Sequence, residues 1–434
     1  MRAYAIPTIS AGANALLSII FFVGISHAFG DIALGQVVLI QATAAIVLIA
    51  TMPQSGPYLV IARDDADADA RYGRAVILEI AGLLVGFALL FMAAQAPFAI
   101  FDVVRDGALL IFWSLAVQGM GSCPGWLRVR ERWRTYALWI VFPNLVRVPM
   151  ILAAPYVAPD DWLLAARQDP ATIILWFFLL PDGLRLIFVV LPIFLTHFTI
   201  PAVGELRPAA RKIGQNWLYD IGSQVTDVAD KLVVGAFLGP QVLAAYFFAR
   251  RIGATTSMVT EPFYWERYRL ILKSSPNEQR REQGLVYLYG LALAAGIFGV
   301  LGVGLAAALH IPLVGQLVPT AISQHVVLFF AVLLFECMLA ANRWSRFLSQ
   351  LHGLSLQLFA FRLAAFALFG INVALFGGYW GGVGAAIALG ITGLIEAFYL
   401  RFRMLRSVAP RDTRVGDDWL NPDRQVTESD VQTH

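Results

Sequence analysis

The segment "VTDVADKLVVGAFLG", residues 225–239, places three charged side chains in an apolar stretch: Asp227, Asp230 and Lys231. Three further polar residues precede them at steps of three or four: Asn216, Asp220 and Ser223. On a helix, all six lie on one face, and the opposite face is apolar. Such a pattern is typical of a membrane helix that separates lipid from a polar interior.

The helix after the turn at Gly239 and Pro240 runs back alongside this one. Counting away from the turn places Asp230 near Ala249 and Arg250, and Asp227 near Arg251 and Ile252. An unpaired charge at the bilayer centre costs about 2.5–3.5 kcal/mol. We therefore predict that these acids and arginines meet. They either line a polar cavity or form buried pairs that fix the register of the two helices.

Other apolar segments also contain polar or charged residues near their centres: Asn14, Arg147, Asp182, Arg185 and Arg362. Cations outnumber acids at this depth, and guanidinium groups bind phosphates and carboxylates in a bidentate manner. The sequence therefore predicts an anionic substrate. The predicted substrate-binding residues are Asn14, Arg147, Arg185, Lys231, Arg250, Arg251 and Arg362.

Four carboxylates accompany these cations: Asp182, Asp220, Asp227 and Asp230. An unpaired carboxylate in a poorly hydrated cavity could take up a proton, whereas one paired to arginine would stay ionised. Two roles remain open for these acids, namely coupling to a proton or sodium ion, and pairing with cations of the cavity.

The composition is that of a membrane protein. Of 434 residues, 59% are hydrophobic and 14% charged, with a mean hydropathy of +0.69, whereas soluble domains carry roughly 25% charged residues. The net charge of +3 gives no indication of nucleic-acid binding. No P-loop, metal-ligand or catalytic arrangement occurs, so we predict no enzymatic activity, no cofactor and no metal. Cys123 and Cys337 are interpreted as buried apolar residues.

Twelve segments are long and apolar enough to cross a bilayer. They span residues 5–28, 33–52, 75–96, 107–122, 137–157, 172–199, 216–238, 242–263, 285–309, 322–342, 355–377 and 381–400. The loops between them alternate between basic ones and ones in which Asp predominates. Basic loops face the cytoplasm, which places both termini there. The predicted fold class is an all-α polytopic membrane protein.

The two halves of the chain resemble each other. "FGDIALG" (29–35) matches "LGPQVLA" (238–244), with Gly30 aligned to Gly239, and each segment lies between the first two helices of its half. An even number of helices in each half predicts parallel repeats. The predicted domains are a six-helix lobe over 1–200, a cytoplasmic linker over 201–215, a second six-helix lobe over 216–406 and a disordered cytoplasmic tail over 407–434.

"NWLYDIGSQVTDVADKLVVGAFLGPQVLAAYFFARRIG", residues 216–253, resembles the start of the second half of Wzx-type polysaccharide flippases. In that family, a D-K-x-x-[LIV]-G-x-[FL]-[LM]-G segment precedes a Tyr-containing helix that often ends in Ala-Arg-Arg. The matching positions are Asp230, Lys231, Gly235, Leu238, Gly239, Tyr246 and Arg250. The resemblance is specific here and general elsewhere, and "FGDIALGQV" departs from the family's first-half turn.

The resemblance implies the fold of the multidrug/oligosaccharidyl-lipid/polysaccharide (MOP) exporter superfamily, in which two six-helix bundles form a V around a central cavity. It implies a bacterial inner-membrane flippase that moves undecaprenyl-diphosphate-linked oligosaccharide to the outer leaflet by alternating access. The product would serve O-antigen, exopolysaccharide or capsule synthesis. Membrane lipid and the polysaccharide polymerase machinery would be its partners.

The sequence also bears on three other functions. A multidrug or cation antiporter of the same superfamily would favour an acidic cavity without surplus arginine. A lipid II flippase commonly has fourteen spans, and twelve are found here. A membrane glycan polymerase or ligase would need a large outer loop, and the longest such loop, "YVAPDDWLLAARQD", is short.

Overall fold

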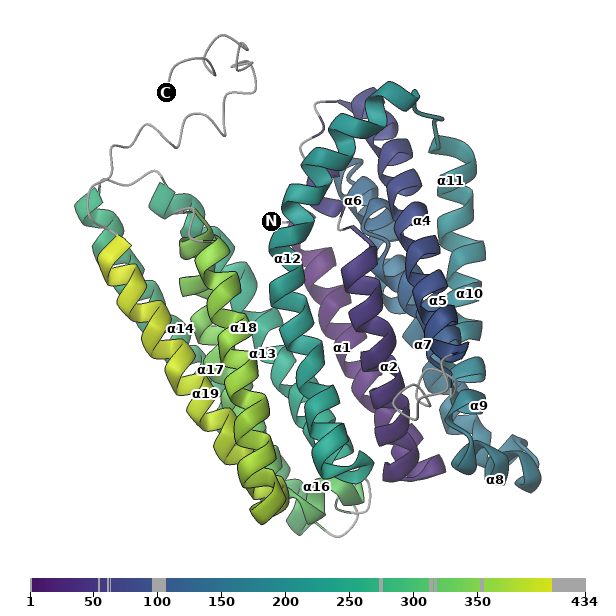
Figure 1. Cartoon of the computed structure of the whole chain (residues 1–434), viewed down its shortest axis with the longest axis vertical. Helices are drawn as coiled ribbons and strands as arrows, with labels where there is room; N and C mark the ends of the chain where they lie inside the picture. The colour runs from purple at the N-terminus through teal and green to yellow at the C-terminus, as the bar shows by residue number, and fades with distance from the viewer. Residues whose placement is uncertain are drawn as a thin grey trace.

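The protein is an all-helical membrane protein, described here from a computed structural model. The structure describes residues 2–407 except 54, 61, 63, 96–106, 273–275, 312–314, 316, 317 and 352–354. The first half of the chain forms one bundle of helices, the N-terminal bundle (Figure 1). Its elements are α1 (Arg2–Phe29), α2 (Asp31–Thr51), α3 (Gly56–Val60), α4 (Asp65–Gln95), α5 (Leu109–Gly119), α6 (Ser122–Val129), α7 (Trp133–Val157), α8 (Asp160–Gln168), α9 (Pro170–Ile174), the π-helical η3 (Leu175–Leu179), α10 (Leu180–Arg185), η4 (Leu186–Val190) and α11 (Leu191–His197).

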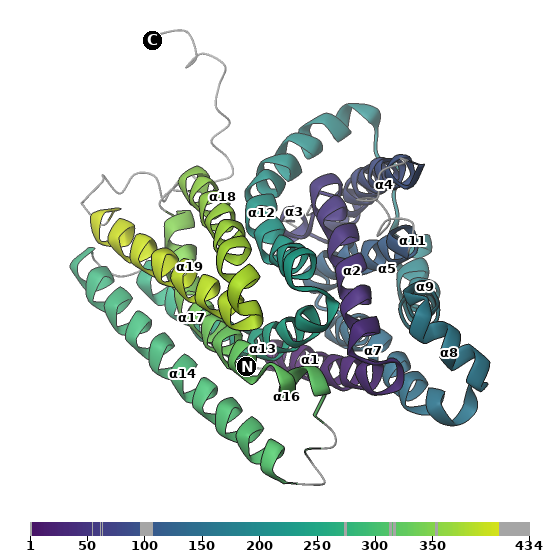
Figure 2. The same cartoon turned by 60° about the horizontal axis from the view of Figure 1, so that its bottom comes forward.

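The second half forms the C-terminal bundle, which stands beside the first in both views (Figure 1, Figure 2). Its elements are α12 (Val203–Leu238), α13 (Pro240–Leu272), α14 (Pro276–His310), α16 (Thr320–Gln324), α17 (Val326–Leu351), α18 (Ser355–Asn372), η5 (Val373–Gly377) and α19 (Gly378–Ser407). The predicted linker over 201–215 is mostly the first part of α12. The predicted tail lies outside the described residues, apart from Ser407, the last residue of α19.

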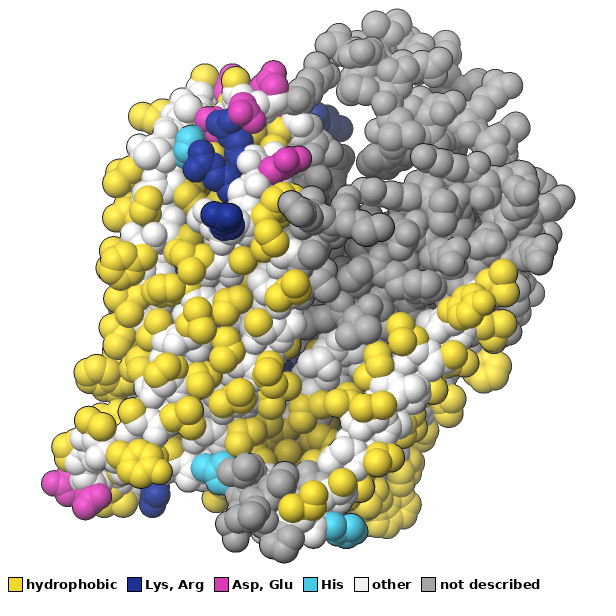
Figure 3. Space-filling view, turned by 180° about the vertical axis from the view of Figure 1, so that it is seen from behind, with side chains coloured by type: hydrophobic (Ala, Val, Ile, Leu, Met, Phe, Trp, Pro, Cys, Tyr) yellow, Lys and Arg dark blue, Asp and Glu magenta, His cyan; other side chains and the backbone are white. Residues whose placement is uncertain are grey.

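Each of the twelve predicted spans is largely helical. Within the described part of the chain, seven helices are long and apolar enough to cross a membrane by length and composition. The predicted span 107–122 is short, because α5 covers only Leu109–Gly119. On the face in Figure 3, hydrophobic side chains cover a broad band and charged side chains gather mainly at one end.

The ends of the molecule differ in charge. One end, called here the charged end, is formed by α3, α6 and the first turns of α4 and α12. Ion pairs join its elements, including Arg130 Nη2 to Asp69 Oδ2 at 2.8 Å and Arg74 Nη2 to Glu205 Oε2 at 3.0 Å. The opposite end, called here the α16 end, contains the α1–α2 and α12–α13 turns and α16 (Figure 1).

The two equivalent turns have the same unusual backbone. Gly30, between α1 and α2, has φ 95°, and Gly239, between α12 and α13, has φ 83°. These angles favour glycine because a side chain would clash with the backbone. The structure thus confirms that the aligned glycines occupy matching turns, as expected if the halves are repeats.

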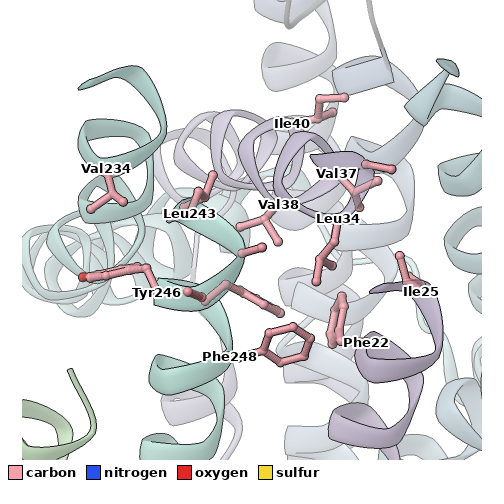
Figure 4. Packing of buried hydrophobic residues seen from close by; sticks show 14 of the residues in the cluster. Phe22, Ile25, Leu34, Val37, Val38, Ile40, Val234, Leu243, Tyr246 and Phe248 are labelled. Atoms are coloured by element: carbon pink, nitrogen blue, oxygen red, sulfur yellow. The ribbon is translucent and has the colours of Figure 1, made fainter. Parts of the chain in front are cut away.

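The bundles meet along α2, which packs against α12 and α13. An apolar core joins them, and Figure 4 shows Phe22, Leu34 and Val38 facing Leu243 and Phe248. The Phe22 and Phe247 rings meet edge to face with centroids 4.7 Å apart. This contact leaves the bundles close together at the α16 end, while their helices diverge toward the charged end (Figure 1).

Candidate substrate site between the bundles

A buried ion-pair cluster occupies the interior of the N-terminal bundle. Asp182 of α10 is fully buried and pairs with two guanidinium groups. Arg147 Nη2 of α7 lies 2.5 Å from Asp182 Oδ2, and Arg185 Nη2 lies 3.1 Å from Oδ1. Gln118 Nε2 donates to Oδ2 at 2.9 Å, and the Ser114 hydroxyl donates to the same oxygen. Four side chains from α5, α7 and α10 thus meet at the carboxyl group of Asp182.

Proline chemistry explains how Arg147 is anchored. Pro181 has no N–H, so the carbonyl of Phe177, four residues earlier, lacks its usual helical donor. Residues 175–179 form the π-helical turn η3 at this point, and Arg147 Nε donates to the Phe177 carbonyl at 2.9 Å. Pro181 thus leaves the Phe177 carbonyl free to accept a hydrogen bond from Arg147.

Arg185 remains incompletely satisfied. Its side chain is buried, and its Nε and Nη2 atoms have no hydrogen-bond partner with good geometry. The guanidinium carbon lies 4.3 Å from the centre of the Trp139 ring, a cation–π contact that offsets part of the burial cost. Two guanidiniums therefore share one carboxylate in this bundle.

A second cluster lies in the C-terminal bundle. Arg250 Nη2 of α13 lies 3.1 Å from Asp230 Oδ2 of α12, and Arg250 Nη1 pairs with Glu336 of α17. Tyr246 Oη donates to Asp230 Oδ2 at 2.5 Å, and Lys231 Nζ lies 3.4 Å from Oδ1. Asp230 and Arg250 meet as counting from the turn predicted. In this cluster, two cations balance two carboxylates.

Gly253 lets α17 approach this cluster, and we predict that Gly253→Ala destabilises the protein by about 1–3 kcal/mol. A Cβ at this position would lie 2.3 Å from Cβ of Glu336, so α17 would have to move and carry its carboxylate away from Arg250. Thermal unfolding of the purified protein measures the effect. Gly296→Ala in α14 is the matched control, because a Cβ there meets nothing within 4 Å. Equal stability of the two variants would disprove the packing argument.

Arg251 has a different environment. Its side chain leaves α13 and crosses to the N-terminal bundle, where Nε lies 3.0 Å and Nη2 2.5 Å from Ser18 Oγ of α1. Its guanidinium carbon lies 5.8 Å from the Phe22 ring centre, while that of Arg147 lies 5.7 Å from the neighbouring Phe21 ring. The two arginines thus lie beside adjacent phenylalanines of α1. Arg251 thus brings a positive charge to the junction of the bundles with a neutral hydroxyl as its hydrogen-bond partner.

The remaining predicted residues fall into two groups. Asn14 lies on α1 and accepts a hydrogen bond from Asn144 Nδ2 at 2.8 Å, and Asn144 Oδ1 in turn accepts one from Arg147 at 3.3 Å. The side chains of Asp220, Asp227 and Arg362 lie outside the described residues. Roles in substrate binding or ion coupling therefore remain predictions for every member of the set.

Sequence reasoning did not single out several partners: Ser114, Gln118, Trp139 and Asn144. Asn144 precedes Arg147 by three residues and shares its helical face, so that spacing could have identified it. Ser114 and Gln118 show the same one-turn spacing in α5. Among the described residues, no group of His, Cys, Asp and Glu could hold a metal ion. Cys123 and Cys337 are both free and buried, as predicted.

Comparison with known proteins defines the fold. No family model and no curated protein sequence matches the chain. Solved structures match over nearly its whole length, among them an inward-facing conformation of a multidrug resistance MATE family transporter of the MOP superfamily. That match has a TM-score of 0.60 and 15% identity, covering 91% of this chain and 95% of the other. The chain has the MATE transporter fold.

Two further structures with this fold are similar. The MATE multidrug transporter DinF-BH, solved as a complex, gives a TM-score of 0.56 at 14% identity, covering 94% of this chain and 95% of its own. An outward-facing conformation of a multidrug resistance MATE family transporter gives 0.53 at 12% identity, covering 93% and 96%. These matches support the predicted MOP architecture but do not single out a Wzx-type flippase.

Proposed function

We propose that this protein is an alternating-access transporter that moves an anionic lipid-linked oligosaccharide of the undecaprenyl-diphosphate class across the bacterial inner membrane. The MATE fold supports a transporter, and the charges of the candidate site support an anionic substrate. Among the described side chains of this site, Arg147, Arg185, Lys231, Arg250 and Arg251 face three carboxylates. The negative charges of a diphosphate headgroup would balance this excess of cations over carboxylates.

The position and the hydrogen-bond partner of Arg251 are the observation on which the proposal depends. Its guanidinium lies between the bundles and is hydrogen-bonded to the neutral Ser18. A phosphate can replace a serine hydroxyl on a guanidinium and form two charge-assisted hydrogen bonds. The sugar diphosphate would enter from the charged end, which the positive-inside rule assigns to the cytoplasm, and the prenyl chain would stay in lipid.

Deletion of the gene from its host tests the substrate. We expect lipid-linked oligosaccharide to accumulate in the inner leaflet and surface glycan to disappear, because the carrier could no longer cross the membrane. The measurements are the amount of carrier-linked saccharide and of surface glycan, each with and without a plasmid copy of the gene. Normal surface glycan in the deletion strain would refute the proposal.

Multidrug export is the second candidate function, and the matched structures favour it, because they are structures of multidrug transporters. The same deletion strain distinguishes the two functions when it is grown with a cationic dye such as ethidium. Increased dye sensitivity with intact surface glycan would support drug export, whereas unchanged sensitivity with lost glycan would support the flippase.

A further inference from the structure

The bundles are joined at the α16 end by a polar contact that involves Asp31, the first residue of α2. Its side chain is 7% exposed, although aspartate is rarely buried without partners. Its Oδ1 accepts a hydrogen bond from the Ser26 hydroxyl within the N-terminal bundle. This bond orients the carboxylate and leaves Oδ2 directed toward the C-terminal bundle.

Oδ2 accepts two hydrogen bonds from α16. Thr320 Oγ1 donates at 2.6 Å and the backbone N–H of Ala321 at 2.6 Å. Both donors belong to the first turn of α16, where backbone N–H groups have no helical acceptor. A carboxylate therefore satisfies one of these groups across the boundary between the bundles, and hydrogen bonds of this charged kind are stronger than neutral ones.

The surface that receives Asp31 is held together by the C-terminal bundle itself. Gln241 Nε2 of α13 donates to Gln324 Oε1 of α16 at 2.6 Å, which ties α16 to the start of α13. One turn after Asp31, Gly35 packs against the start of α13, so closely that a Cβ would lie 1.9 Å from the Pro240 carbonyl oxygen. The polar contact thus sits beside a backbone-to-backbone contact on the same face of α2.

We propose that Asp31, Thr320 and Ala321 form a latch that holds the bundles together at the α16 end. Opening this end requires that α2 separate from α16 and α13, so both hydrogen bonds to Oδ2 must break. Water then takes their place, because the groups lie at the end of the molecule rather than deep in the bilayer. The bond from Ser26 stays within one bundle and keeps Asp31 oriented for closure. The latch thereby sets the balance between closed and open forms of this end.

Distances between spin labels on the two bundles test the latch in purified full-length protein. Gln168 of α8 and Val327 of α17 are exposed near the α16 end and can carry the labels after the two native cysteines are replaced. Asp31→Ala is expected to raise the population of longer distances about tenfold. Thr320→Val should give a smaller rise, because the Ala321 N–H still reaches the carboxylate.

Asp161→Ala is the matched control, since Asp161 is an exposed acid at the same end and should leave the distances unchanged. Gly35→Ala forces α2 from α13 by a steric clash with Pro240, so it shows that the labels detect opening of this end. Unchanged distances in Asp31→Ala, or in Thr320→Val if Asp31→Ala does not fold, would overturn the latch. The measurement needs no substrate, so it stands apart from the deletion experiment, which tests the transported molecule alone.

Discussion

Replacing Arg251 with glutamine is expected to weaken binding of undecaprenyl diphosphate to the purified protein by about ten- to a hundredfold. Arg251 extends from α13 toward α1 and is hydrogen-bonded there to the neutral Ser18. Glutamine keeps a hydrogen-bond donor near Ser18 but removes the charge that a diphosphate would contact. In the complemented deletion strain, surface glycan should fall in step with affinity.

Ser18→Ala separates a substrate contact from a structural one. If Arg251 serves only to join the bundles, loss of Ser18 should harm the protein as much as loss of the guanidinium. If Arg251 binds phosphate, Ser18→Ala should leave affinity unchanged or raise it, because the guanidinium no longer has a competing acceptor. Arg134→Gln, at an exposed position of the charged end, controls for a general loss of positive charge. Wild-type affinity in Arg251→Gln would remove the basis for the anionic substrate.

The helices were predictable because the bilayer imposes their length. Each crossing needs about 20 apolar residues, so a hydropathy window of that size detects it. The first and last residues of the helices were harder to predict. Helix α12 begins at Val203, well before residue 216, where its predicted span begins. A window of apolar residues detects only the part of a helix that lies in the bilayer, and not a polar extension beyond it. The short α8 between α7 and α9 lies outside any window of that length.

Contacts within a helical hairpin were also predictable. A tight turn at Gly239 fixes the register of α12 and α13, so Asp230 and Arg250 could be placed at equal depth and were found to pair. The pair Arg147 and Asp182 escaped prediction for the same reason. Helix α8 separates their helices, and the π-helical turn η3 shifts the register of the second helix before Asp182, so counting from a loop fails.

Contacts between the bundles leave no local signal. Arg251 and Ser18 are 233 positions apart, and Asp31 and Thr320 are 289 positions apart. In the sequence, Asp31 is one of several aspartates in the loops between apolar segments, and no spacing sets it apart. Its burial and its bonds to α16 depend on how two bundles dock, which is set by shape and packing along α2 rather than by any residue spacing.

The charged residues divide according to whether their contacts lie within one bundle or between the two. Each bundle contains a cluster in which a carboxylate holds several helices together, so these arginines are engaged before any substrate arrives. Arg251 and Asp31 instead connect one bundle to the other, and Asp31 does so at the α16 end. A molecule that draws Arg251 away from Ser18 would weaken the junction between the bundles. Substrate binding would in this way be coupled to movement of the bundles through the contact between Arg251 and Ser18.

Asp182→Asn is expected to destabilise the protein by about 3–5 kcal/mol, the usual cost of removing one partner from a buried ion pair. The amide nearly preserves the shape of the carboxylate, so packing changes little. Arg147 and Arg185 would, however, lose the carboxylate that they share, and both are buried. Arg185 already has two nitrogen atoms without hydrogen-bond partners, so its contact with Trp139 offsets only part of the loss.

The two buried cysteines provide the measurement. A thiol-reactive dye reaches Cys123 and Cys337 only when the helices around them open, so the reaction rate on heating reports unfolding. Asp182→Asn should react at a lower temperature than the parent protein, whereas Asp161→Asn, at an exposed position, should react like the parent. Asp182→Asn combined with Arg147→Met should recover part of the loss, because it removes one of the two uncompensated charges. Parental stability in the single variant would mean that water or another group already neutralises these arginines.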